Sequence, residues 1–310
     1  MLGGVVLLWF IEVDLAVAWV AWDIRQTPEA TVLKWGFVVV TGFSGLFGAL
    51  LYALACREPL PGTHQAYVSP RWHQVVGSTM HCVAGDGIGI LVTAAALAPL
   101  HLPAIVDLGA EYGVGFGFGW TIFQALFMRG MLGGSYGLAL RHTFLPELLS
   151  MNGVMAAMAA VSAPWQEALA AAASPASLDF WFVMSLALCA GFLVAYPINW
   201  WLVASGLKHG MTTTMPDGKD APLAAGLALA GAALAEDRHG SHQGRSDRAM
   251  AGQPVSRAEF EVRTASAPPP GHHHLVTSRG QQLPEMVVAS FAMLATGVVV
   301  AGLAGNLFGV

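Results

Sequence analysis

Long apolar stretches recur along the whole 310-residue chain and constrain its fold more than any other feature. Seven of them are apolar enough to cross a bilayer, which takes about 20 residues in a helix. They cover roughly residues 1 to 22, 35 to 56, 77 to 99, 107 to 127, 148 to 165, 179 to 206 and 284 to 308. Only 11% of the residues are charged, against about 25% in soluble domains. The sequence therefore predicts an all-α, polytopic helical membrane protein with about seven transmembrane helices.

A change of composition near residue 210 divides the chain. We predict a six-helix membrane core over residues 1–210, a mostly disordered cytoplasmic loop over 211–282, and a C-terminal transmembrane helix over 283–310. The loop is first rich in Ala and Gly, then charged, and it contains a run of three prolines and the triplet 272–274 of histidines. Such a composition offers too little apolar surface to form a packed core.

The basic residues are distributed unevenly over the predicted loops. With seven spans, all of the 14 Lys and Arg residues except Arg25 and Lys34 fall in the second, fourth and sixth loops. The positive-inside rule then predicts a multi-pass protein of the inner (plasma) membrane, with its N-terminus in the cytoplasm and its C-terminus outside. The net charge of -5 gives no sign of a nucleic-acid partner, so the lipid bilayer is the expected partner. A homo-oligomer is left open.

The third apolar stretch contains ionisable groups at bilayer depth. His81, Cys82 and Asp86 lie within it, and Asp86 is near the midplane, about 15 Å from a helix start at Val76 if each residue rises 1.5 Å. Ionisable side chains at this depth are costly and usually face a cavity, a partner or a pathway. Imidazole, thiolate and carboxylate are ligands of transition metals, whereas a proton relay needs the same groups. The stretch therefore predicts a transport site for a small cation or a proton.

Spacing alone does not bring the three side chains together. Cys82 and Asp86 are four residues apart and share a helix face, whereas His81 lies about 140° around the helix from Asp86. Gly85, Gly87 and Gly89 would permit the helix to unwind, so that all three groups turn to one cavity as in discontinuous transporter helices. Alternatively, the glycines merely admit a neighbouring helix, and His81 bonds Asp86 or a backbone carbonyl.

Side chains on other stretches extend the predicted site. The polar part adds Gln124, Glu147, Asn152 and Asn199, and the predicted metal ligands are His81, Cys82, Asp86, Met151 and Met155. A methionine stripe at helical spacing is also typical of plain packing. Pro146 and Glu147 both suit the first turn of a helix, which gives Glu147 a purely structural alternative. Glu111 is either an interfacial carboxylate or the outer mouth of the path.

Short sequence motifs link the chain to a known family. They are Leu33–Gly36, Cys56–Pro59, Gly77–Asp86, Phe123–Met128, Met131–Tyr136, Leu145–Asn152, Tyr196–Asn199 and Gly206–Met211. On these motifs the chain resembles a bacterial membrane family known as domain of unknown function 4396, over roughly residues 10 to 215 and the final helix. The resemblance implies a multi-spanning membrane protein and no particular chemistry.

Two classes of function follow from these residues. The first is a transporter or permease of a transition-metal cation, with or without proton coupling, whose mid-membrane site is His81, Cys82 and Asp86; a transition-metal ion is the only cofactor that the residues suggest. The second is a non-transporting membrane scaffold or metal-handling assembly factor, in which these side chains bond neighbouring helices. No Ser/His/Asp or HExxH arrangement occurs, so we do not expect an enzyme.

Overall fold

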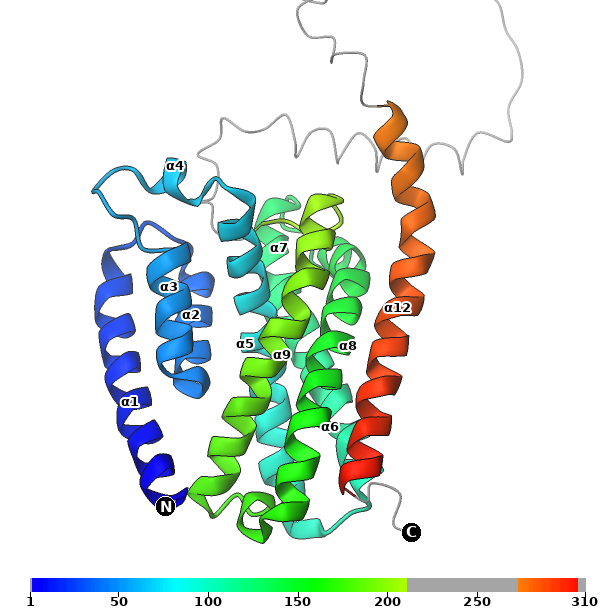
Figure 1. Cartoon of the computed structure of the whole chain (residues 1–310). Coiled ribbons are helices and arrows are strands. Elements are labelled where there is room, and N and C mark those ends of the chain that lie inside the picture. Colours follow the sequence, from blue (N-terminus) through cyan, green and yellow to red (C-terminus); the bar gives the residue numbers. More distant parts are fainter. Residues whose placement is uncertain (1, 211–272, 306–310) are drawn as a thin grey trace, which may run out of the picture. The chain divides into compact units, whose positions relative to one another are not determined.

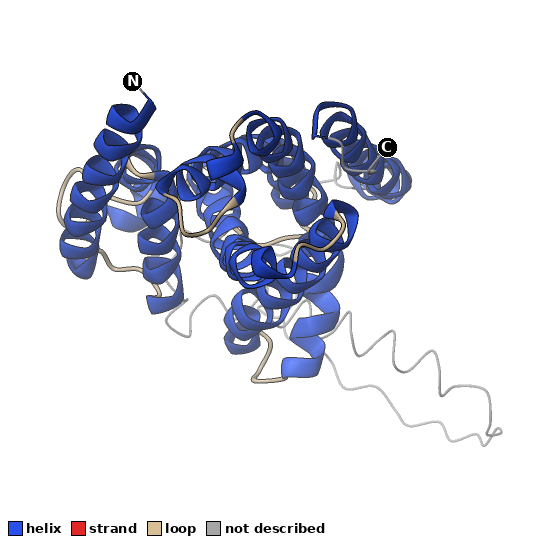
Figure 2. Cartoon of the chain, turned by 90° about the horizontal axis from the view of Figure 1, so that it is seen from below, coloured by secondary structure: helices blue, strands red, loops and turns tan. Residues whose placement is uncertain are grey.

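The computed structural model describes residues 2–210 and 273–305. The predicted cytoplasmic loop over 211–282 lies outside the described residues up to residue 272. Its last part, residues 273–282, is helical, so the final helix begins earlier than the predicted residue 283. All regular structure in the described part is helical, as predicted (Figure 2). Within the described part of the chain, residues 2–210 and 286–305 belong to one compact unit, and this unit contains the candidate site.

Five of the described helices are long and apolar enough to cross a membrane. They are α1 (Leu2–Asp23), α5 (Arg71–Leu97), α8 (Tyr136–Ala168), α9 (Leu178–Ala204) and α12 (His273–Gly305). The shorter helices are α2 (Thr31–Ser44), α3 (Leu46–Ala55), α4 (His64–Val68), α6 (Ala104–Phe118) and α7 (Ala125–Met131). Three 3-10 turns, η1 (Ile24–Gln26), η2 (Ala98–Leu100) and η4 (Ala170–Ala173), and one π-helical turn, η3 (Gly119–Gln124), complete the list. These apolar helices are those of a membrane protein, but the predicted count of seven spans is not confirmed.

The predicted span 35–56 is a helical hairpin. Gly45 separates α2 from α3 with a φ of +55°, a value that glycine adopts far more easily than other residues. At 1.5 Å per residue the two helices are about 21 and 15 Å long, too short for a hydrocarbon core of about 30 Å. Figure 1 shows α2 and α3 side by side. Hydropathy alone missed this break because both halves of the hairpin are apolar.

Both ends of the hairpin lie on the same side of the compact unit. The Asp23 carboxylate, before α2, accepts hydrogen bonds from Tyr52 Oη at 2.7 Å and from Arg57 Nε at 2.8 Å, at the end of α3. Glu29 Oε1 and His64 Nε2 are also paired, at 2.8 Å. The chain therefore does not cross the unit between residues 23 and 64, and α5 begins on the side where α1 ends.

The predicted span 107–127 is a continuous helical segment made of α6, η3 and α7. Its first part lines the same cavity as Ala94 near the end of α5. Its last part packs against the beginning of α8, where Met128 meets Ala139. The segment thus runs antiparallel to α5 from one side of the compact unit to the other.

The helix that contains Glu147 begins earlier than predicted. Ser135 caps α8, and its hydroxyl accepts a hydrogen bond from the Leu138 N–H at 3.4 Å. Pro146 and Glu147 therefore lie inside the helix, and Glu147 is fully buried. Proline suits a helix start but also occurs inside helices, where it removes one backbone hydrogen bond. The helix-start explanation of Glu147 no longer applies.

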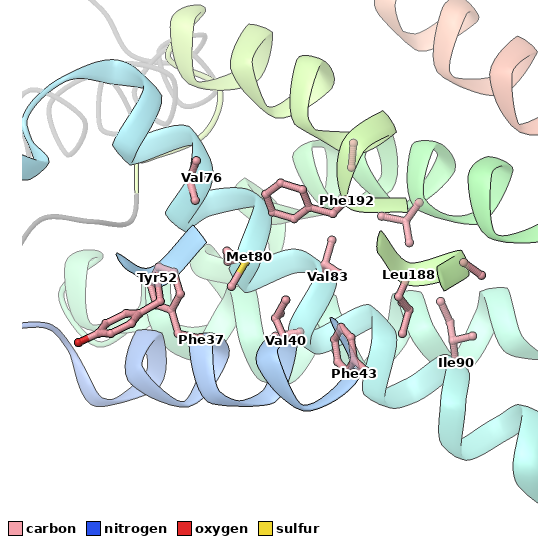
Figure 3. Packing of buried hydrophobic residues seen from close by; sticks show 14 of the residues in the cluster. Phe37, Val40, Phe43, Tyr52, Val76, Met80, Val83, Ile90, Leu188 and Phe192 are labelled. Carbon is pink, nitrogen blue, oxygen red and sulfur yellow. The ribbon is translucent and has the colours of Figure 1, made fainter. Parts of the chain in front are cut away.

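An apolar core holds α5 against the hairpin and against α9. Figure 3 shows Phe37 of α2, Met80 and Val83 of α5, and Leu188 and Phe192 of α9 within this core. Burial of such side chains is the main favourable contribution to packing in the unit's interior. It fixes one face of α5, while the face of Cys82 and Asp86 turns to α6, η3 and α8.

Candidate functional site

Helix α5 runs without a break through the predicted site, so the expected unwinding does not occur. Its glycines instead admit a neighbouring helix. A Cβ atom on Gly85 would lie 2.8 Å from the Cα of Gly119, and one on Gly89 would lie 2.7 Å from the Cα of Gly115. The part of the sequence alternative in which the glycines admit a neighbouring helix is confirmed. Its other part, a hydrogen bond from His81 to Asp86 or to a backbone carbonyl, is wrong, because neither ring nitrogen has a partner among the described residues.

A π-helical turn in the neighbouring segment matches one α-helical turn of α5. Cys82 and Asp86 are four residues apart, whereas Gly119 and Gln124 are five apart, the spacing of one π-helical turn. Gln124 Nε2 donates a hydrogen bond to Cys82 Sγ at 2.9 Å, and Gly119 lies against Asp86. Single π-helical turns inside α-helices are frequent at functional sites. Here the turn places one glycine and one amide opposite two polar residues.

Two buried carboxyl groups meet beside Gly119. A Cβ atom on this glycine would overlap Oδ1 of Asp86 and lie 2.9 Å from Oε1 of Glu147. Both side chains are fully buried and interact electrostatically. Among the described residues, neither Asp86 oxygen nor Glu147 Oε1 has a hydrogen-bond donor. Because carboxylates only accept hydrogen bonds and repel each other, such a pair needs a proton or a cation between its members.

Lys208 supplies a positive charge on the other side of Glu147. Its Nζ lies 3.7 Å from Glu147 Oε2 and donates hydrogen bonds to Cys82 Sγ and, at 2.8 Å, to Asn199 Oδ1. The Cys82 thiol donates in turn to Glu147 Oε2 at 2.9 Å, and Asn199 Nδ2 donates to Ser150 Oγ at 2.9 Å. This buried network links α5, α8 and the end of α9.

The turn after α9 explains how a residue beyond the helix enters the bundle. Gly206 has a φ of +73°, and the N–H groups of Leu207 and Lys208 both bond to the carbonyl of Leu202, at 3.0 and 3.1 Å. A glycine in this conformation commonly ends a helix and reverses the chain. Sequence reasoning counted Lys208 only as a basic loop residue. The signal that could have identified it is its place in the family motif Gly206–Met211.

Two other predicted site residues face different surroundings. The His81 ring lies against Phe123 and Phe127, with centroid distances of 5.3 and 5.4 Å, and neither ring nitrogen has a hydrogen-bond partner among the described residues. Asn152 accepts a hydrogen bond from Tyr112 Oη at 2.7 Å and donates one to Ser290 Oγ of α12 at 3.2 Å. His81 and Asn152 therefore do not join the Cys82 network.

The predicted metal site is not supported. In the described part of the chain, no three His, Cys, Asp or Glu side chains are placed to hold a metal ion. On the unbroken helix His81 diverges from Asp86, as the helical period requires. The other predicted ligands, Met151 and Met155, belong to the apolar core. The Lys208 ammonium, a cation supplied by the chain, bonds Cys82 instead.

An acidic cavity of about 500 Å³ lies toward the other end of the same helices. Its lining includes Asp107 and Glu111 of α6 and Glu167 of α8, together with Ala94 of α5 and Ala159 of α8. Glu111, for which the sequence left an interfacial carboxylate and an outer mouth as alternatives, thus lines this cavity. Glu111 and Gly119 are eight residues apart, so about 12 Å of helix separates the cavity from the carboxyl pair.

One apolar layer lies between the cavity and the pair, at the level of Gly115. A Cβ atom on Gly115 would lie 2.7 Å from Ile90 Cγ1 and 3.1 Å from Met151 Cε. Ile90 is one helical turn from Asp86, and Met151 is one turn from Glu147. Along α5, α6 and α8, the acidic cavity, the apolar layer and the Asp86–Glu147 pair therefore follow one another at intervals of about one helical turn.

Residues 71–208 match the family described as "Domain of unknown function (DUF4396)". The match confirms the resemblance that the motifs indicated, over a narrower range than residues 10 to 215. Neither the curated proteins nor the solved structures include a match to this chain. The matched segment begins with α5 and ends at Lys208, so it contains Cys82, Asp86, Gln124, Glu147 and Asn199 as well. Over residues 71–208, which are less than half of the chain, the protein is therefore similar to the family described as a domain of unknown function, DUF4396.

Proposed function

We propose that the protein is a membrane transport protein that moves a proton or a small cation by way of Asp86 and Glu147. The supporting observation is that these two carboxyl groups are fully buried and face each other, while three of their four oxygens have no donor among the described residues. Side chains with a purely structural role usually have their hydrogen bonds satisfied. Ionisable groups at membrane depth instead tend to mark ion and proton paths.

The acidic cavity extends this proposal to an entrance. Carboxylates around a cleft concentrate cations near it. From Asp107 and Glu111 a cation would pass the layer of Ile90 and Met151 to reach Asp86. Rearrangement of this single apolar layer would open the site to the cavity, as hydrophobic constrictions do in other channels and transporters.

We further propose that the cavity opens to the outside of the cell and that both termini lie outside. With the hairpin, Arg25 and Lys34 join the side of the other basic residues, so all 14 Lys and Arg residues would fall on one side. The connections 98–103 and 169–177, on the opposite side, contain none. The beginning of α1 is on that opposite side too, because Val6 packs with Ala172. Relative to the sequence prediction, the positive-inside rule then moves the N-terminus to the outside and residues 25–34 to the cytoplasm.

Flux through the reconstituted protein tests the proposed transport. Purified protein in liposomes that contain a pH-sensitive dye is exposed to a pH gradient and to gradients of single cations. We expect wild-type protein to speed dissipation, and Asp86→Asn or Glu147→Gln to slow it by more than about tenfold, because each removes an ionisable group of the path. Asp14→Asn on the exposed face of α1 is the matched control and should retain wild-type flux.

The scaffold remains the second candidate, since one observation favours it. The hydrogen bonds among Cys82, Glu147, Lys208 and Asn199 tie three helices together and would also suit a static role. In that case liposomes with wild-type protein would be as tight as protein-free liposomes under every gradient. This result would reject transport.

A further inference from the structure

We infer that Lys208 is a tethered cation that limits the site to one further positive charge, so that the transported species is a monovalent cation that exchanges with a proton. This inference rests on the proposed transport function. It concerns the class of substrate, which the buried position of the carboxyl pair does not define by itself.

The contacts of Lys208 are those of a bound cation. Its side chain is buried, and its ammonium bonds Cys82 Sγ and Asn199 Oδ1 and faces Glu147 Oε2. An ammonium has three donors, and these acceptors lie around it. One side of Glu147 is thereby occupied by a cation that cannot leave the protein. The other side, Glu147 Oε1 with both Asp86 oxygens, has no donor among the described residues.

Around Glu147 Oε1 and the two Asp86 oxygens, the charges of the chain lack one positive charge. Asp86 and Glu147 contribute two carboxylates, and Lys208 contributes one ammonium. The groups that face them from the surrounding elements are neutral: the Cys82 thiol on α5, the Gln124 amide on η3, the Asn199 amide on α9 and the Tyr112 phenol on α6, which interacts electrostatically with Asp86. The His81 ring faces Phe123 and Phe127. An uncompensated charge in such an interior is strongly unfavourable.

One proton or one monovalent cation therefore neutralises the site. A divalent cation would leave an excess positive charge in the same interior, which is as unfavourable as the deficit. Since the proton and the monovalent cation satisfy the same deficit at the same oxygens, binding of one releases the other. Without the lysine charge the deficit becomes two, and a divalent cation becomes the better match.

The test compares cation-driven proton release in proteoliposomes with an acidic interior. NaCl, KCl and MgCl₂ are added separately to wild-type protein, Lys208→Met, Lys208→Arg and Asp86→Asn. We expect wild-type protein to exchange protons with Na⁺ or K⁺ at least about tenfold faster than with Mg²⁺. Lys208→Met should reverse this preference. Lys208→Arg should keep it at a lower rate, because guanidinium retains the charge but not the geometry of an ammonium.

Two results would overturn the inference while leaving the proposed function intact. One is that Lys208→Met keeps the preference of the wild-type protein for monovalent cations. The other is proton movement in wild-type protein that needs no cation but is lost in Asp86→Asn. If wild-type protein gives no flux that depends on Asp86, the proposed function itself fails. Should Lys208→Met not fold, Lys208→Ala is purified and assayed with methylammonium. If the Lys208 ammonium acts as a bound cation, methylammonium should restore monovalent exchange. An absence of restoration would contradict the inference.

Discussion

At the scale of single residues, the carboxyl pair depends on the missing side chain of Gly119. The backbone of η3 approaches α5 closely at Gly85, and the carboxyl groups of Asp86 and Glu147 share the space beside Gly119. Any larger residue would occupy the position of the Asp86 oxygen. Glycine is thus required here for room, since η3 is helical and the φ of Gly119 is -58°.

Gly119→Ala should therefore separate the two carboxyl groups. We expect a loss of about 1–3 kcal/mol in the free energy of unfolding, typical of an extra methyl group in a packed interior, together with loss of flux. Thermal unfolding of the purified variant and the liposome assay measure both effects. Gly117→Ala is the matched control, because nothing lies within 4 Å of a Cβ atom there. Equal behaviour of the two variants would contradict the arrangement of the pair.

A second buried pair, Glu29 and His64, should make stability depend on pH. Burial raises the pKa of Glu29 to about 8 and lowers the pKa of His64. The neutral forms of both side chains are therefore the ones that the folded state favours. The contribution of Glu29 is fully present below its ordinary pKa of 4.5 and is lost as pH rises toward 8. The contribution of His64 has the opposite sign and is lost as pH falls below 6.5.

Glu29→Gln removes one of these two dependences. Melting temperatures of the wild-type protein should fall as pH is raised from 6.5 to 8, where the His64 contribution is already fully present, whereas those of the variant should fall less, since glutamine does not ionise. The variant should keep the loss of stability on the acidic side. A slope between these pH values that is the same in both proteins would contradict the burial of Glu29.

At the scale of elements, the hairpin α2–α3 depends on the backbone conformation of Gly45. Its positive φ is strained for other residues, and a Cβ atom there would also overlap Glu12 Oε2 and lie 3.0 Å from Val13 Cγ2 of α1. Gly45→Ala should therefore cost about 2 kcal/mol or more of stability. Gly42→Ala, in the same hairpin with nothing within 4 Å of the new Cβ atom, should cost little. Chemical denaturation of both variants in detergent provides the comparison.

At the scale of the whole molecule, the hairpin changes which residues share a side of the membrane. Seven spans would place residue 25 outside and residues 3 and 60 in the cytoplasm. The structure places residues 25 and 60 on one side and residue 3 on the other, because Asp23 and Arg57 are in contact and Val6 packs with Ala172. We propose that the side of residue 3 is the outside.

Labelling of single cysteines decides between these topologies. Gly3→Cys, Arg25→Cys and Leu60→Cys are introduced separately into a chain without its native cysteines, since Cys56, Cys82 and Cys189 are free thiols. A maleimide that does not cross membranes should label only residue 3 in intact cells, and all three residues after lysis. Labelling of residue 25 but not of residues 3 and 60 in intact cells would restore the seven-span topology.

The sequence by itself determined that this chain forms apolar helices of a membrane protein and that Cys82 and Asp86 share a helix face, because hydropathy and the helical period are local properties. It did not separate a hairpin from a span at Gly45, because one backbone angle decides between them. The partners were decided only by the tertiary structure: Glu147 meets Cys82 across 65 residues, and Lys208 meets it across 126. Contacts at such separations depend on how helices pack. Here they depend on one π-helical turn, on the close approach at Gly85, Gly89, Gly115 and Gly119, and on the reversal at Gly206, and no local sequence pattern combines these features.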